Sequence, residues 1–241
     1  MRAISRWTAT ALVLTAAAFG LGGCRGTPPR ADGYRVAPAI DLFNGTDLTG
    51  WTQRGGNATY IVEDGCIVGR TAPNQPNSFL CTNQTYADFV LQLEFMVDNE
   101  LNSGVQIRSN STPEHQNGRV HGYQVEIDPS DRAWTGGIYD EGRRGWIADL
   151  STNAEARAAF KPGEWNSMRV EAVGDRIRTW INDVPCADLR DDATRSGFIA
   201  LQVHGIGPRS DPLEVRWRSI RIAPLTPETD RDRLTSPRSD G

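Results

Sequence analysis

Short runs of alternating apolar and polar residues dominate the chain between residues 39 and 225. A period of two is typical of half-buried β-strands, because successive side chains point to opposite faces of a sheet. Turn sequences such as Asp64-Gly65 and Gly174-Asp175 separate several runs, since Gly and Asp accept positive φ. The predicted strands are 60–63, 66–68, 79–82, 89–95, 104–108, 123–127, 166–171, 176–181, 197–203 and 215–222.

One helix is predicted, in the Ala-rich segment 153–160, where Glu155 comes early. Many short strands with hardly any helix favour an all-β, two-sheet sandwich. The strand-forming region, residues 39–225, has a length that suits one domain, and no internal repeat divides it.

The first 23 residues have the parts of a bacterial export signal in order: Arg2 and Arg6, the apolar run 7–21, and a Leu-Gly-Gly-Cys sequence that ends at Cys24. This order resembles the lipobox of bacterial lipoproteins, which implies cleavage before Cys24, lipidation of its thiol and anchoring to a membrane. Arg25 in the next position favours the periplasmic face of the outer membrane, on the sorting pattern of lipoproteins. An ordinary signal peptide is the alternative.

The two flanks of the domain have little to bury. Residues 24–38 are rich in Gly, Pro and Arg and predict a flexible tether, and residues 226–241 predict a disordered tail. The formal net charge is −4 with both signs mixed along the chain. The absence of a basic stripe from the sequence argues against nucleic acid as a partner.

Beyond Cys24 the chain has three cysteines, Cys66, Cys81 and Cys186. Export would place them in an oxidising compartment, where disulfides persist. Cys66 and Cys81 lie on neighbouring predicted strands and are the predicted pair; three buried free thiols are the alternative. No Cys-x-x-Cys or His-rich spacing indicates zinc, and a divalent metal, calcium or another, stays open as a cofactor.

Several longer motifs follow one another in a fixed order: Leu-Phe-Asn-Gly-Thr-Asp-Leu-Thr-Gly-Trp at 42–51, Asn-Ser-Gly-Val-Gln-Ile-Arg at 102–108, Gly-Tyr-Gln-Val-Glu-Ile at 122–127, Thr-Gly-Gly-Ile-Tyr at 135–139, Gly-Glu-Trp-Asn at 163–166 and Leu-Gln-Val-His-Gly at 201–205. Over residues 39–225 they resemble the 3-keto-disaccharide hydrolase domain family. The resemblance implies a concanavalin A-like jelly roll and cleavage of glycosides already oxidised to a ketone at sugar carbon 3. A separate sugar 3-dehydrogenase would supply that ketone, because no dinucleotide-binding fingerprint follows a strand here.

A ketone at carbon 3 acidifies the hydrogen on carbon 2. A general base can then remove it, and the aglycone leaves by elimination before water adds back. Such a site needs a base and a stabiliser for the enolate oxygen, and it does not need the paired carboxylates of an ordinary glycosidase.

Glu126 is the leading candidate for the base or acid, because alternation places it with Gln124 on one strand face and puts Val125 and Ile127 on the other. His204 shares a face with Gln202 and is the predicted catalytic partner. The predicted substrate-binding residues are Arg108, Gln124, Gln202, Asn102, Ser103, Tyr123 and Tyr139. For each of them a structural role is the competing interpretation.

Two other functions compete with elimination. A lipid-anchored sandwich could be a carbohydrate-binding module with no catalysis. A laminarinase-like glycosidase would need a second carboxylate beside Glu126, for which Asp128 and Asp131 are the candidates, and Asp131 has an odd spacing for the same face.

Overall fold

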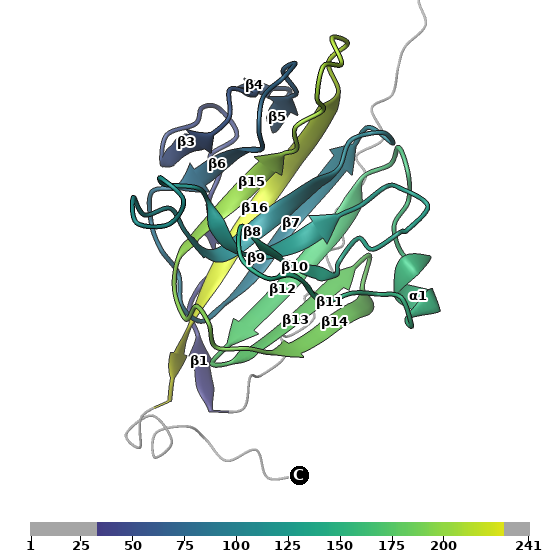
Figure 1. The fold of residues 1–241 in the computed structure, drawn as a ribbon. Helices are drawn as coiled ribbons and strands as arrows, with labels where there is room; N and C mark the ends of the chain where they lie inside the picture. The colour runs from purple at the N-terminus through teal and green to yellow at the C-terminus, as the bar shows by residue number, and fades with distance from the viewer. Residues whose placement is uncertain (1–32, 229–241) are drawn as a thin grey trace, which may run out of the picture.

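The computed structural model describes residues 33–228, which form two antiparallel β-sheets packed face to face (Figure 1). Every strand predicted from the sequence is present, so the two-sheet sandwich is confirmed. The signal sequence and Cys24 lie outside the described residues.

The larger sheet has nine strands. Seven lie in the order β14 (Val184–Arg190), β13 (Arg176–Ile181), β12 (Asn166–Val173), β7 (Phe89–Val97), β16 (Glu214–Pro227), β5 (Cys66–Arg70) and β4 (Thr59–Glu63). The short strands β1 (Tyr34–Val36) and β2 (Ile40–Asp41) pair with β16. Strand β14 escaped prediction because it contains Pro185, which strands tolerate mainly at a sheet edge, where β14 lies.

The smaller sheet has seven strands. Its face away from the core is called the polar face here, because it carries Gln124 and Glu126. Their order is β11 (Gly145–Ala148), β10 (Ile138–Glu141), β9 (His121–Ile127), β8 (Ser103–Asn110), β15 (Phe198–Val203), β6 (Ser78–Thr82) and β3 (Trp51–Gly55). On β9, the side chains of Tyr123, Val125 and Ile127 are buried in the core between the sheets. Alternation therefore turns Gln124 and Glu126 to the opposite face.

The core between the sheets is built from large apolar side chains of both layers. Trp217, Phe89 and Phe95 of the larger sheet and Ile107 of the smaller sheet are fully buried in one cluster. Burial of a single side chain of this size stabilises a fold by about 1.5–3 kcal/mol. This packing gives the smaller sheet a rigid base for the groups on its other face.

Tight turns join neighbouring strands, among them the predicted turn at Asp64-Gly65. In the β4–β5 turn, Asp64 and Gly65 have φ values of 51° and 70°, and in the β13–β14 turn Asn182 and Asp183 have 49° and 65°. Consecutive positive φ values are characteristic of two-residue hairpin turns that match the twist of the strands.

The predicted helix is present but short. Helix α1 spans Ala154–Arg157, and Asn153 caps it by accepting a hydrogen bond from the backbone N–H of Ala156. No helix within residues 33–228 has the length and apolarity that crossing a bilayer requires.

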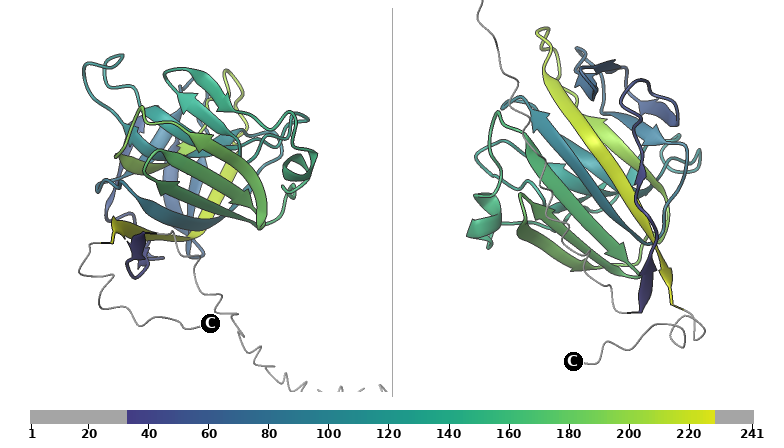
Figure 2. Two further views of the ribbon diagram at one scale, coloured as in Figure 1. Left: turned by 90° about the horizontal axis from the view of Figure 1, so that it is seen from below. Right: turned by 180° about the vertical axis from the view of Figure 1, so that it is seen from behind.

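Parts of the two predicted flanks form strands. Residues Tyr34, Arg35 and Val36 pair with Leu225–Pro227, at the end of β16, so part of the predicted tether and the first residues of the predicted tail form a ladder (Figure 2). These strands are far apart in sequence, and a local pattern does not reveal such a pairing.

The predicted disulfide is wrong. Cys66 is on β5 of the larger sheet and Cys81 is on β6 of the smaller sheet, and both are free and buried. Cys186 is also free and is half-buried. Burial raises the pKa of the Cys81 thiol to about 12. The chain changes sheets between these two strands, so neighbours in sequence are not neighbours in space.

Candidate functional site

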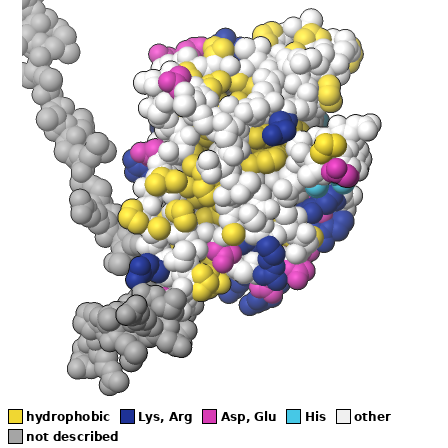
Figure 3. All heavy atoms as spheres, turned by 90° about the vertical axis from the view of Figure 1, so that its left-hand side faces the viewer, with side chains coloured by type: hydrophobic (Ala, Val, Ile, Leu, Met, Phe, Trp, Pro, Cys, Tyr) yellow, Lys and Arg dark blue, Asp and Glu magenta, His cyan; other side chains and the backbone are white. Residues whose placement is uncertain are grey.

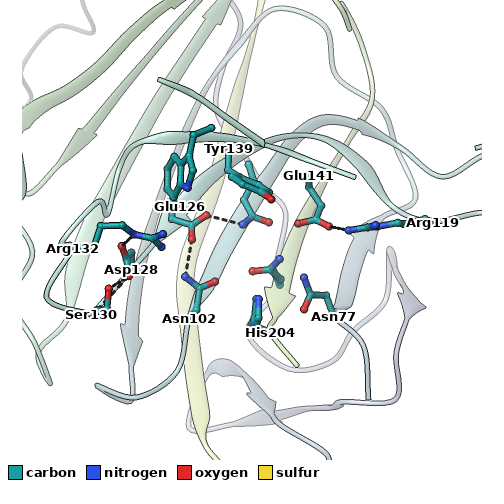
Figure 4. Close-up of a pocket in the computed structure, with 13 residues that line it drawn as sticks. Asn77, Asn102, Arg119, Glu126, Asp128, Ser130, Arg132, Tyr139, Glu141 and His204 are labelled. Carbon is teal, nitrogen blue, oxygen red and sulfur yellow. Dashed lines mark hydrogen bonds and ion pairs between the residues drawn. The ribbon is translucent and has the colours of Figure 1, made fainter. Parts of the chain in front are cut away.

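A cleft of about 680 Å³ opens on the polar face of the smaller sheet (Figure 4). Six of the residues predicted from the sequence line it together: Asn102, Gln124, Glu126, Tyr139, Gln202 and His204. Seven more complete its lining: Asn77, Arg119, Asp128, Ser130, Arg132, Glu141 and Trp146. The volume is within the usual range of small-ligand sites.

Glu126 is held in the cleft by two side-chain amides. Asn102 donates from Nδ2 to Oε1 at 2.6 Å, and Gln124 donates from Nε2 to Oε2 at 2.8 Å. Glu126 is only 4% exposed. Burial raises its pKa to about 7, although the two amide hydrogen bonds act in the opposite direction. A carboxyl group with this pKa can both take up and release a proton near neutral pH.

The Gln124 amide is oriented by a chain of hydrogen bonds beneath the cleft. Ser109 Oγ donates to Gln106 Oε1 at 2.7 Å, and Gln106 Nε2 donates to Gln124 Oε1 at 2.7 Å. Every donor in the chain therefore points toward Glu126, an arrangement in which each bond polarises the next. The chain fixes which end of Gln124 faces the carboxylate.

Gly104 leaves the space that Gln124 needs. It lies on β8, opposite Glu126 in the sheet register, and a Cβ at this position would be 2.6 Å from both Cγ and Cδ of Gln124. The missing side chain lets Gln124 extend across β8 and reach the carboxylate. Glycine is required here for close approach, since its φ is not positive.

Asp128 forms a tightly bonded group at one end of the cleft (Figure 4). Its Oδ1 accepts a hydrogen bond from Ser130 Oγ at 2.6 Å, and its Oδ2 accepts one from Arg132 Nε at 2.7 Å. Burial alone would raise the pKa of Asp128, but the bonds from Arg132 and Ser130 outweigh it and hold the pKa below its usual value. Asp128 therefore stays ionised, and both of its carboxylate oxygens already accept hydrogen bonds.

The rest of this end is aromatic. The Arg132 guanidinium lies 5.0 Å from the centroid of the Trp134 ring and 4.9 Å from that of Trp146. Trp146 also contacts Tyr139 edge to face, with ring centroids 5.3 Å apart. Aromatic faces beside polar groups are a common surface for sugar rings, which present both C–H and O–H groups.

The other end of the cleft carries an ion pair and a histidine (Figure 4). Arg119 bonds to the largely buried Glu141 at 2.8 Å. His204 is exposed and its Nδ1 lies 2.8 Å from the backbone oxygen of Gly205. Between residues 33 and 228 no hydrogen bond joins His204 to Glu126, so the predicted pair shares a cleft without direct contact. Within the same range, no three His, Cys, Asp or Glu side chains gather as a metal-binding group.

Three predicted substrate-binding residues lie elsewhere. Arg108 is fully buried and pairs with Asp88 at 2.7 Å, Ser103 donates to the backbone oxygen of Gln202, and Tyr123 packs in the core with its hydroxyl directed at Asp191. None of the three lines the cleft. Arg108 is misplaced by alternation because β8 has a register shift between Ile107 and Asn110, where Arg108 has a φ of 46°.

The sequence contained a signal for one of the missed residues. Glu141 is two positions after Tyr139 on β10, so alternation places both on the same face. Arg119 and Arg132 are in loops, and Asn77 precedes β6, so no strand period could assign them. On the side of the molecule drawn in Figure 3, acidic and basic side chains lie interspersed, so charge does not single out a site on that side.

The raised pKa of Glu126 makes stability depend on pH. Below about pH 4.5 the carboxyl group holds its proton in both the folded and the unfolded chain. As the pH rises toward 7, only the unfolded chain loses this proton, so the free energy of unfolding falls. Above pH 7 the loss of stability stays constant. We expect Glu126→Gln to remove this cost. Urea unfolding gives the free energy of unfolding of the variant minus that of wild type. We expect this difference to be larger at pH 8 than at pH 4.5 by roughly 1–3 kcal/mol. An equal difference at the two pH values would contradict the raised pKa.

Solved structures with the same fold come from several carbohydrate-related proteins. A glycosyl hydrolase candidate from Parabacteroides distasonis is 20% identical with a TM-score of 0.54, covering 81% of this chain and 95% of that one. The carbohydrate-binding module CBM66 of Bacillus subtilis is 17% identical with a TM-score of 0.54, covering 74% and 98%. The laminarinase catalytic domain of Thermotoga petrophila is 11% identical with a TM-score of 0.54, covering 81% and 99%. At these identities the likeness establishes the concanavalin A-like jelly-roll fold alone.

Sequence comparison is more specific. No curated protein matches the chain significantly. A family model described as the 3-keto-alpha-glucoside-1,2-lyase-like domain matches residues 38–223, which include every residue of the cleft. The domain is thus a carbohydrate-active or carbohydrate-binding jelly roll. Because the family model matches most of the chain, the chain belongs to the 3-keto-alpha-glucoside-1,2-lyase-like domain family.

Proposed function

We propose that this protein cleaves 3-keto-glycosides by elimination, with Glu126 as the general base. The observation that carries the proposal is the burial of the Glu126 carboxyl group, with a pKa of about 7, at the surface of a sugar-sized cleft in which the other two carboxyl groups, Asp128 and Glu141, are paired with arginines. Elimination needs one base matched to neutral pH, and a glycosidase of the usual kind needs two carboxyl groups with separate roles. Family membership supports 3-keto-glycosides as the substrate class.

The reaction balances without an oxidant or reductant. Glu126 takes the proton from carbon 2, and the C–H electron pair forms a double bond to carbon 3 while the ketone oxygen becomes an enolate. The enolate then returns its electrons, a double bond forms between carbons 1 and 2, and the bond from carbon 1 to the aglycone oxygen breaks. Glu126 returns its proton, directly or through water, to the leaving oxygen, and a water molecule then adds across the new double bond, with its hydroxyl on carbon 1 and its hydrogen on carbon 2, to give the free 3-keto sugar.

Of the two positions that the sequence offers for the second carboxylate of a glycosidase, only Asp128 lines the cleft, and there it is held in an ion pair with Arg132. Asp131 is exposed and is not part of the cleft lining, and both oxygens of Asp128 already accept hydrogen bonds. The carbohydrate-binding alternative keeps the same cleft without turnover. It does not account for a buried carboxyl group whose charge the fold disfavours.

The decisive experiment compares two sugars. The protein is incubated with a 3-keto-disaccharide and separately with the unoxidised parent, with and without a divalent metal, and the products are followed by chromatography. We expect cleavage of the keto sugar only. Cleavage of the parent alone would support the glycosidase, and binding without cleavage of either sugar would support the binding module.

The rate of cleavage should follow the ionisation of Glu126. A base acts when deprotonated, so kcat/KM is expected to rise with pH up to about 7 and to level off above it. Initial rates measured from pH 5 to pH 9 give the profile. A rate that falls as pH rises through 7 would mean that Glu126 works as an acid and not as the base.

A further inference from the structure

Gln202 is buried in the cleft without a hydrogen-bond partner. It is 0% exposed and lines the cleft, yet neither its Nε2 nor its Oε1 is bonded to any protein group that the structure describes. A buried amide left unpaired is costly, so few occur in native proteins, and a ligand is one reason for keeping one. Trp217 Nε1 is also unpaired, but it belongs to the core and has no cleft beside it.

The register of the smaller sheet places Gln202 in line with Glu126. Gly104 on β8 is opposite Glu126 on β9 and opposite Gln202 on β15. Adjacent strands are about 4.8 Å apart, so the two backbones that carry these side chains are separated by roughly 10 Å, with glycine between them. Glu126 and the unpaired Gln202 amide therefore flank Gly104, over which the side chain of Gln124 lies.

This spacing matches the order of groups that the elimination reaction requires. The base takes a proton from carbon 2. The oxygen that becomes the enolate oxygen is bonded to the neighbouring carbon 3. Resting on the proposed function, we propose that the Gln202 amide binds this oxygen. Its Nε2–H donates to the carbon 3 oxygen, and its Oε1 accepts from a neighbouring sugar hydroxyl. The donor gains strength as negative charge develops on that oxygen.

Among the amides in the described cleft lining, only Gln202 is fully buried and unpaired, whereas Asn77 is half-buried and accepts a hydrogen bond from the backbone N–H of Gly205. Gln124 and Asn102 already donate to Glu126, and Gln106 is committed to Gln124. The ligand class is thus a sugar with a carbonyl next to a hydroxyl, bound through one donor and one acceptor of the same amide.

The test uses Gln202→Met, which keeps the length of the side chain and removes the amide. Gln92→Met is the matched control, because Gln92 is exposed on β7 of the other sheet. We expect Gln202→Met to lower kcat on the 3-keto-disaccharide by about 100- to 1000-fold. Its Tm should equal or exceed that of wild type, because the substitution removes an unpaired amide, and the control should match wild type in both respects.

Binding is measured separately from cleavage. Titration calorimetry compares Glu126→Gln with the double variant Glu126→Gln/Gln202→Met, using the intact 3-keto-disaccharide. We expect at least about tenfold weaker binding by the double variant, as the loss of the two ligand hydrogen bonds of the Gln202 amide implies. If wild type cleaves neither sugar but this binding loss is seen, the proposed function fails and the Gln202 inference stands. If cleavage and binding are both unchanged within twofold, or if no sugar binds to Glu126→Gln, the inference is overturned.

Discussion

Glu126→Gln is expected to abolish most cleavage of the 3-keto-disaccharide. A positioned general base contributes about 10²- to 10⁴-fold to a rate, and glutamine keeps the size of the side chain without the ability to take a proton. Product release at pH 8, where wild-type Glu126 is largely ionised, measures the loss directly. The loss should appear in kcat, because the new amide oxygen can still accept from Gln124 and the Asn102 amide can turn its oxygen toward the new N–H donor, which keeps the shape of the site.

A matched control separates chemistry from folding. Glu94→Gln makes the same change on β7, where Glu94 pairs with Arg218 at 3.0 Å on the larger sheet, and it should leave the rate unchanged. The variant Glu126→Gln should also be at least as stable as wild type at pH 8, since it removes a buried charge. Retention of more than about a tenth of the wild-type rate would rule Glu126 out as the base.

The residues that the sequence located correctly are those fixed by the period of a strand. Glu126 and Gln124 alternate with core residues on β9, and Gln202 does so on β15 between Leu201 and Val203. Burial of the apolar face of a strand also fixes which residues lie on its other face. A register shift of one residue would expose all of the apolar side chains. The floor of the cleft was therefore predictable from local sequence alone.

The residues that the sequence missed or misplaced depend on contacts between distant segments. Cys66 and Cys81 are separated by a change of sheet, and Arg119 reaches Glu141 from a loop. The bulge on β8 turns Arg108 out of the alternation. Neither the spacing nor the composition of the chain encodes such features locally, so they require the folded arrangement.

Arg108→Met tests the revised role of Arg108, which is structural. The guanidinium donates to the backbone oxygen of Ala87 at 2.6 Å, to that of Gly174 at 2.8 Å and to Asp88 at 2.7 Å. Removing the cation leaves a largely buried carboxylate and two carbonyl groups without their donor, and breaking such a pair costs about 3–5 kcal/mol. Urea unfolding should show a loss of this size, with activity per folded molecule close to that of wild type.

An exposed arginine gives the contrast. Arg221 pairs with Asp41 at 2.7 Å, but the two side chains are 62% and 60% exposed. Because solvent screens an exposed pair, Arg221→Met should cost less than about 1 kcal/mol. If Arg108→Met instead kept the stability of wild type and lost cleavage, the arginine would be acting on the substrate after all. The comparison therefore decides whether Arg108 supports the sandwich or serves the cleft.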